Sequence, residues 1–117
     1  MIRFDGYYAF KPILYQERIE LSPDYLNMGL LFKKNGDVIN TVKWSQSKEM
    51  IFFKKNNFEA VNFYGKFNVN KDELYILSYK GEPWEEKFYY DIVSEKRLIN
   101  RQTGELLEFI PWDNNKE

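Results

Sequence analysis

Acidic side chains are the first residues whose grouping could support chemistry. Two groups of three carboxylates lie close together in the chain. They are Glu17, Glu20 and Asp24, and Glu85, Glu86 and Asp91. Such groups can bind a hard cation or supply an acid and a base. Neither has the spacing of a calcium-binding loop, and solvated strand faces carry carboxylates in the same way, so we expect no metal site and no cofactor.

The chain contains neither histidine nor cysteine. This composition removes disulfides, thiolate nucleophiles, the usual general base and the usual transition-metal ligand. An enzyme would have to use Asp, Glu, Lys, Tyr or Arg alone, and no pattern of these residues marks a catalytic constellation. We therefore expect a protein that is not an enzyme.

Aromatic residues make up 19% of the chain, as ten Phe, nine Tyr and three Trp. The core of a domain this small cannot hold all of these rings, since each buries about 150–250 Å². We expect some of them to form an exposed or half-exposed patch that binds a ligand or a partner, covered either by residues 45–57 or by another molecule. The candidates are Tyr64, Tyr75, Tyr79, Trp84 and Tyr89. The alternative is cross-strand ring pairing that only stabilises the sheet.

The tryptophans and lysine pairs raise two further possibilities. Trp44, Trp84 and Trp112 are expected near strand ends, where they would plug a barrel or anchor a partner. The pairs 33–34 and 54–55 place lysine beside phenylalanine, as in proteins that bind single-stranded nucleic acid. Lysine at turns also prevents edge pairing, and a formal net charge of −1 does not attract a polyanion. We expect no nucleic-acid partner.

Length and hydropathy indicate one domain over residues 1–112, followed by a polar tail at 113–117. No apolar run approaches the roughly 18 residues of a membrane-spanning helix. The abundance of Lys and Asn suggests a bacterial source with an AT-rich genome. If Met1 is the native start we expect a cytoplasmic protein, and if a leader was removed, a periplasmic or surface protein. The sequence leaves the oligomeric state open.

Alternation of apolar and polar residues predicts about eight strands separated by short turns. Their ranges are 4–11, 25–33, 37–44, 62–69, 73–80, 85–93, 96–101 and 105–111. Leu26, Met28, Leu30 and Phe32 should share the buried face of one strand. The dipeptide at 35–36, Asn-Gly, favours a two-residue hairpin turn with positive φ at both positions.

In two segments the apolar residues follow neither the period of a strand nor that of a helix. Residues 12–24 are expected to form a covering loop with a short strand or a helical turn. Residues 45–57 fit either a short helix or an extended link outside the barrel, followed by a turn at 56–57. Connections this short make neighbouring strands antiparallel. We predict an all-β, antiparallel up-and-down barrel of about eight strands, with at most one or two short helices.

Several of these segments together resemble small bacterial lipocalin-like (calycin-type) domains. They are the first strand Asp5-Gly6-Tyr7-Tyr8, the hairpin at 32–38, the segment Gly65-Lys66-Phe67 and the closing strand at 104–111. Lipocalins carry Gly-x-Trp in the first strand, where this chain has Tyr8, and they are longer. The resemblance implies a binding or structural barrel.

Two functions remain after these exclusions. The first is a non-catalytic module that holds a small hydrophobic ligand or a peptide at an aromatic-lined barrel mouth. The alternative is a protein–protein interaction module, such as an inhibitor or immunity-type partner, that uses an outer aromatic face. An open cavity would favour the ligand, and an interior filled by side chains would favour the interaction module.

Overall fold

The protein is described here by a computed structural model that covers residues 2–15, 24–58, 63–78 and 86–112. Within these ranges the chain forms antiparallel strands and one short 3-10 helix, η1 (Lys55–Phe58). The strands are β1 (Gly6–Phe10), β2 (Ile13–Tyr15), β3 (Asp24–Phe32), β4 (Asp37–Ser45), β5 (Phe63–Asn70), β6 (Glu73–Ser78), β7 (Glu86–Ser94), β8 (Arg97–Asn100) and β9 (Leu106–Pro111). The predicted all-β class is confirmed.

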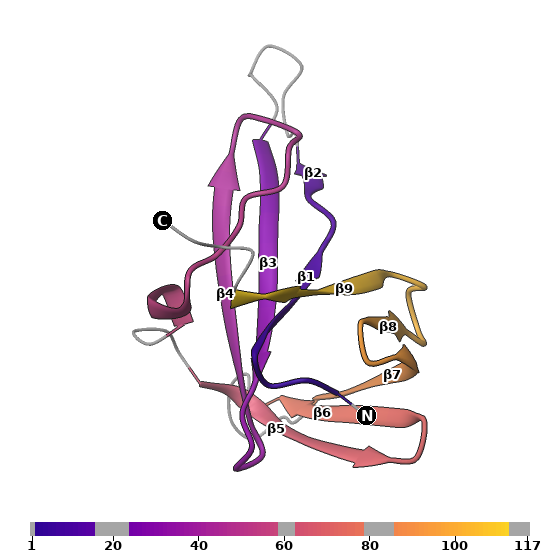
Figure 1. The fold of residues 1–117 in the computed structure, drawn as a ribbon. Coiled ribbons are helices and arrows are strands. Elements are labelled where there is room, and N and C mark those ends of the chain that lie inside the picture. Colours follow the sequence, from indigo (N-terminus) through magenta and orange to yellow (C-terminus); the bar gives the residue numbers. More distant parts are fainter. Residues whose placement is uncertain (1, 16–23, 59–62, 79–85, 113–117) are drawn as a thin grey trace.

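Eight of these strands close into a barrel (Figure 1). The sheet order is β1-β9-β8-β7-β6-β5-β4-β3-β2, and β1 also pairs with β3. All these pairings are antiparallel. The described part of the chain has no helix with the length and apolar character needed to cross a membrane.

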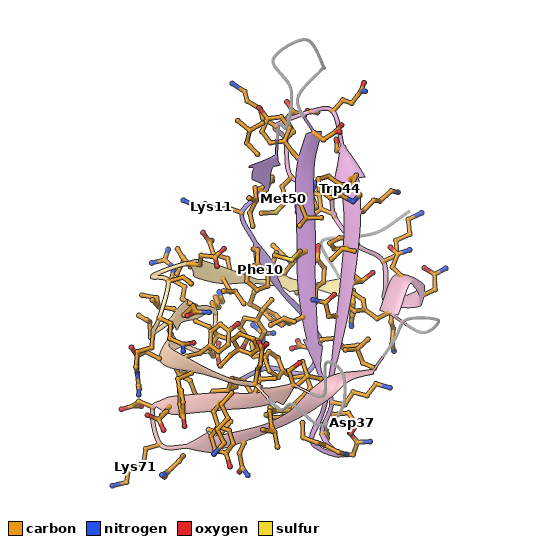
Figure 2. The ribbon with its side chains drawn as sticks, turned by 180° about the vertical axis from the view of Figure 1, so that it is seen from behind. Phe10, Lys11, Asp37, Trp44, Met50 and Lys71 are labelled. Carbon is orange, nitrogen blue, oxygen red and sulfur yellow. The ribbon has the colours of Figure 1, made fainter. Side chains whose placement is uncertain are left out.

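The additional strand, β2, lies along β3 beyond the point where β1 ends. Ala9 of β1 pairs with Gly29, whereas Ile13 of β2 pairs with Leu26 rather than with Tyr25, so the register shifts by one residue between them. Pro12 lies in this break and has no N–H for a ladder bond. The short strand expected within 12–24 is therefore present, and β3 and β4 run past β9 out of the barrel (Figures 1 and 2).

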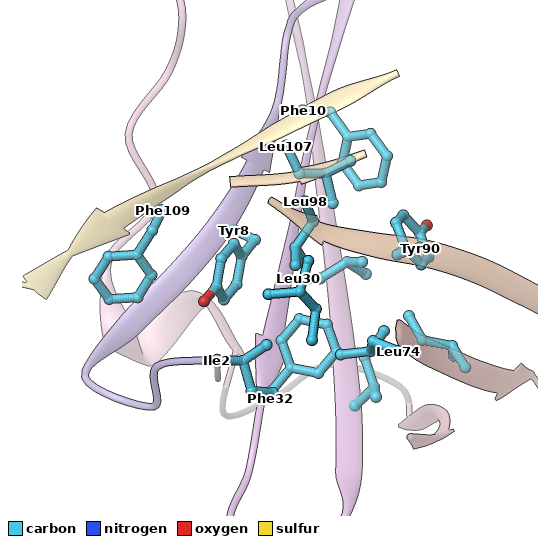
Figure 3. Close-up of a cluster of buried hydrophobic side chains, with 13 residues drawn as sticks. Ile2, Tyr8, Phe10, Leu30, Phe32, Leu74, Tyr90, Leu98, Leu107 and Phe109 are labelled. Carbon is cyan, nitrogen blue, oxygen red and sulfur yellow. The ribbon is translucent and has the colours of Figure 1, made fainter. Parts of the chain in front are cut away.

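Thirteen of the described side chains form a buried core inside the barrel (Figure 3). Leu30 and Phe32 of β3 lie among them, as their alternation predicts, and Met28 packs partly against them. Ile2 from the N-terminal segment joins the same core, and the Phe4 ring lies 6.4 Å from that of Phe67. An eight-stranded barrel is just wide enough for its inward side chains to fill it.

The turn between β3 and β4 differs from the predicted two-residue hairpin. The N–H of Lys33 donates to the carbonyl of Asp37 (2.9 Å), and the N–H of Gly36 donates to the carbonyl of Lys33 (3.0 Å). Only Gly36 in this turn has a positive φ, 98°. The Asn35 side chain accepts a hydrogen bond from the N–H of Asp37 (3.0 Å). The loop is thus a three-residue turn ending in a glycine bulge.

A second apolar core lies on the outside of the barrel, beneath residues 46–58, here called the link. Phe53 and Phe58 of the link are buried with Tyr7, Ala9 and Ile39, which face away from the barrel interior. At Gly29 a Cβ would lie 2.9 Å from the Tyr7 ring and 3.2 Å from that of Phe58. Glycine at this position therefore leaves room for the two rings.

Residues 46–54 of the link form no helix, and the link ends in η1, so the structure adopts the non-helical alternative with a helical turn at its end. Trp112 packs on this outer core, with ring centroids 5.5 Å from Tyr7 and 5.8 Å from Phe58. The prediction that Trp112 plugs a barrel mouth is wrong, because Trp112 follows Ile110 by two residues and packs with it against the outer core.

Buried Tyr8 predicts a loss of stability in alkali. Its hydroxyl donates to the carbonyl of Glu95 (2.6 Å) and accepts the N–H of Arg3 (2.9 Å). Burial raises the pKa of Tyr8 above its ordinary value. The resulting stabilisation is complete below about pH 10 and is lost as the pH rises through the higher pKa of the folded protein.

Urea unfolding between about pH 8 and about pH 11 measures this effect. The wild type should lose more stability over that range than Tyr8→Phe, because the variant lacks the titrating hydroxyl at position 8. Equal losses in the two proteins would contradict the assignment.

Candidate functional site

Two of the five predicted patch residues meet on the outer face of β6 and β7. Tyr75 and Tyr89 are direct cross-strand partners, both half-buried, with ring centroids 6.0 Å apart. The Tyr75 hydroxyl lies 3.4 Å from the Asn68 amide, and Lys87 Nζ lies 5.2 Å from the centre of the Tyr75 ring. Arg101 covers Tyr89 at 5.9 Å. These contacts match the cross-strand interpretation, in which the rings stabilise the sheet.

The other three candidates cannot be placed beside this pair. Tyr79 and Trp84 lie outside the described residues, and Tyr64 belongs to β5 but its side chain also lies outside the description. The link was one of two expected covers for the patch. Its buried rings instead pack against Tyr7 and Ile39, on the outer side of β1 and β4.

One carboxylate of the two acidic groups, Asp91, forms an ion pair with Arg101 (2.6 Å), which also contacts Glu73 (2.7 Å). Glu17, Glu20 and Glu85 lie outside the described residues. Hydrogen bonds that Arg101 donates to the carboxylates of Asp91 and Glu73 raise the pKa of Arg101, and a hydrogen bond from the Lys66 ammonium lowers the pKa of Asp37. Across the described ranges, no three His, Cys, Asp or Glu residues come together in a metal-binding arrangement.

A different surface emerges where β3 and β4 leave the barrel. Val38, Val42 and Trp44 face the same side of β4, which is the inward side within the barrel. Val38 is 0% exposed, whereas Val42 is 51% and Trp44 is 52% exposed. Along β3 the burial falls in the same direction, from buried Leu30 to half-buried Leu26. The side that forms the core at one end of the hairpin is therefore an exposed apolar surface at the other.

We call residues 24–28, residues 41–45 and β2 the extension, and its apolar surface the extension face. The face is formed by Ile13, Leu26, Met28, Val42 and Trp44. Ile13, Leu26 and Trp44 make one cross-strand row, and Met28 and Val42 make the next. Ile13, Val42 and Trp44 are three of the exposed large apolar residues of the protein. Figure 2 shows Trp44 far from Lys71, toward the opposite end of the molecule.

The link covers the reverse side of the extension. The N–H of Ile51 donates to the side-chain carbonyl of Asn27 (3.0 Å), and Asn27 is buried. The hydroxyl of Thr41 is 3.4 Å from the carbonyl of Asn57. A short ribbon of strands is marginally stable by itself. The link therefore braces the extension from behind while the extension face stays exposed.

One long edge of β4 adjoins this face. Within the described ranges, β5 pairs with β4 only at Asp37, Val38 and Ile39. Residues 40–45 thus have no described strand beside them on that side. The described charged residues of the extension and the link are Lys43, Lys48, Lys54 and Lys55, against the acidic Asp24 and Glu49.

Sequence analysis correctly placed the residues of this face on one side of the strand but did not predict that part of the face is exposed. It assigned Val38, Val42 and Trp44 to one side of a strand and treated the whole side as core. The signal that could have revealed the extension is strand length. β3 and β4 have nine residues each, whereas β1, which pairs with β3, has five. The two longer strands therefore continue past the end of β1.

Comparisons with known proteins add no evidence on the function. No family model matches the sequence, and no curated protein or solved structure was found to be similar to it. The resemblance to lipocalin-like domains therefore stays a prediction, and the function has to be argued from the residues of this chain.

Proposed function

We propose that this protein is a non-catalytic interaction module that binds an apolar segment of a partner protein on the extension face. The observation that carries the proposal is the change in burial along one side of β4, from Val38 at 0% to Val42 and Trp44 at 51% and 52% exposed. A contiguous apolar surface on a folded protein usually marks a contact site. Burying these side chains against a partner would remove them from water.

The buried core of the barrel supports a protein or peptide partner rather than a small hydrophobic ligand. Pockets for small molecules enclose about 70–90% of the ligand surface. Thirteen buried side chains occupy the barrel core, and the extension face is an open sheet surface with an adjoining edge. A polypeptide can cover such a surface because it supplies its own contact area.

Selection from a displayed library of random twelve-residue peptides tests the proposal. Peptides enriched on the wild-type protein should bind Val42→Glu about tenfold or more weakly, because a charge replaces an apolar contact worth about 1.5–3 kcal/mol. Val93→Glu is the matched control, since Val93 is 56% exposed on β7 and lies outside the extension. Affinities can be measured by fluorescence anisotropy with labelled peptides.

Two results would overturn the proposal. One is that no peptide is enriched, and the other is that the enriched peptides bind both variants as tightly as the wild type. Thermal unfolding of the variants shows whether each remains folded. If Val42→Glu is unfolded, Val42→Thr replaces it, since threonine has the same shape and a hydroxyl in place of one methyl group.

A further inference from the structure

We infer that residues 46–52 of the link, here called the strap, regulate the extension face from its reverse side by docking on Asn27. With the strap docked, the extension is held rigid and its face binds the partner segment tightly. With the strap released, the extension loosens and binding weakens. This inference rests on the proposed function, because it names the regulation of that same face.

β3 carries both sides of this arrangement in three successive residues. Leu26 and Met28 belong to the extension face, and Asn27 between them points to the reverse side. Asn27 is 1% exposed, and its side-chain carbonyl accepts the N–H of Ile51 (3.0 Å). The strap therefore holds the strand that presents the face, and it does not compete with a partner for the face itself.

The strap is held less firmly than the part of the link that follows it. Residues 46–49 are exposed, and Met50 and Ile51 are only half-buried. Phe53 anchors the next part, because its ring is buried and its N–H donates to the Tyr7 hydroxyl (2.9 Å). A segment with little buried apolar surface opens at a lower free energy than the core beside it. The strap can thus be released while Phe53 stays in place.

The Asn27 amide lowers the free-energy difference between the docked and the released strap. Its Nδ2 atom is buried, and none of the described residues accepts a hydrogen bond from it. A buried donor without an acceptor opposes the state that buries it. Release of the strap gives this amide access to water, at the loss of the bond to Ile51. A ligand that prefers one of the two states can then shift the equilibrium between them.

Docking of the strap prepares the extension face for binding. A short ribbon of strands is marginally stable in water by itself, and the strap gives it a second layer. A partner that meets a rigid face does not have to order it, so its affinity is higher. Coupling of this kind is reciprocal, so a partner that prefers the docked strap must oppose its release by the same factor.

Hydrogen exchange measured by NMR on the whole chain tests the inference, with a peptide enriched on the wild type from the random library as the probe. Saturating peptide should slow exchange of the Ile51 amide about fivefold or more, as coupling between two sites requires. The control is the Asn57 amide, which donates to the Lys54 carbonyl (2.9 Å) and should not change. Unchanged exchange at Ile51, or equal slowing at both amides, would refute the inference while the bound peptide still supports the proposed function.

Two substitutions that break the same bond from opposite sides provide a second test. Asn27→Ala removes the acceptor, and Ile51→Pro removes the N–H. Each should weaken binding of the peptide about fivefold or more. The double variant should bind as weakly as either single variant and no more weakly, because the shared contact is lost only once.

Asn68→Ala is the matched control for these variants. Asn68 is exposed on β5 and lies beside Tyr75, outside the extension, so its replacement should leave the affinity unchanged. Wild-type affinity in both single variants, or losses that multiply in the double variant, would refute the inference. The exchange measurement needs neither substitution and decides the matter if a variant is unfolded. If the wild type enriches no peptide at all, the proposed function fails and the inference fails with it.

Discussion

Phe53→Ala is expected to destabilise the protein by about 3–5 kcal/mol, the usual cost of removing a buried phenylalanine ring. Phe53 is 3% exposed, and its ring centroid lies 5.7 Å from Tyr7 and 6.0 Å from Phe58. Its N–H also donates to the Tyr7 hydroxyl (2.9 Å). The substitution leaves a cavity in the outer core and loosens the link from the sheet. Urea unfolding followed by tryptophan fluorescence measures the loss.

The neighbouring residue provides the control. Phe52 has the same side chain in the same segment but is 52% exposed, so Phe52→Ala should cost no more than about 1 kcal/mol. Similar losses for the two variants would show that the link does not dock as described. Because the link also holds the reverse side of the extension through Asn27, Phe53→Ala should in addition speed hydrogen exchange at Thr41 and Lys43 more than Phe52→Ala does.

The contrast between these two residues illustrates what the sequence could not predict. Ile51, Phe52 and Phe53 are three successive apolar residues, so no alternation distinguishes the buried ring from the exposed one. The choice is made by Tyr7, far away in the chain, whose hydroxyl accepts the N–H of Phe53. A contact between such distant segments has no local signature.

The barrel itself could be predicted because its signals are local. Alternation along β3, short connections and turn residues fix the direction and order of the strands. The turn at 34–36 was predicted at the correct place with the wrong geometry. Its type depends on hydrogen bonds made by the Asn35 side chain and by Lys33, which composition alone does not determine.

The candidate site was the least predictable part. Counting rings led to Tyr75 and Tyr89, which are adjacent but are held by Asn68, Lys87 and Arg101. Within the described ranges, the extension face begins where β1 and β5 stop pairing, at Ala9 and Ile39. Alternation identifies which side of a strand is apolar but not the point at which the neighbouring strands end. Sequence analysis therefore predicts the whole apolar side to be core.

Leu30→Ala is expected to cost about 2–5 kcal/mol, because it removes a large side chain from the middle of the barrel core. Leu30 is 1% exposed and lies opposite Tyr8 of β1 and Asn40 of β4, at the level where the barrel closes. The control is Leu14→Ala, on β2, where leucine is 53% exposed and the loss should be within about 1 kcal/mol. The comparison also tests the register, because a slip of one residue would turn Leu30 outward together with the rest of its stripe. Equal urea midpoints for Leu30→Ala and the wild type would mean that the other side of β3 faces the interior, and the extension face would then be assigned to the wrong side of the hairpin.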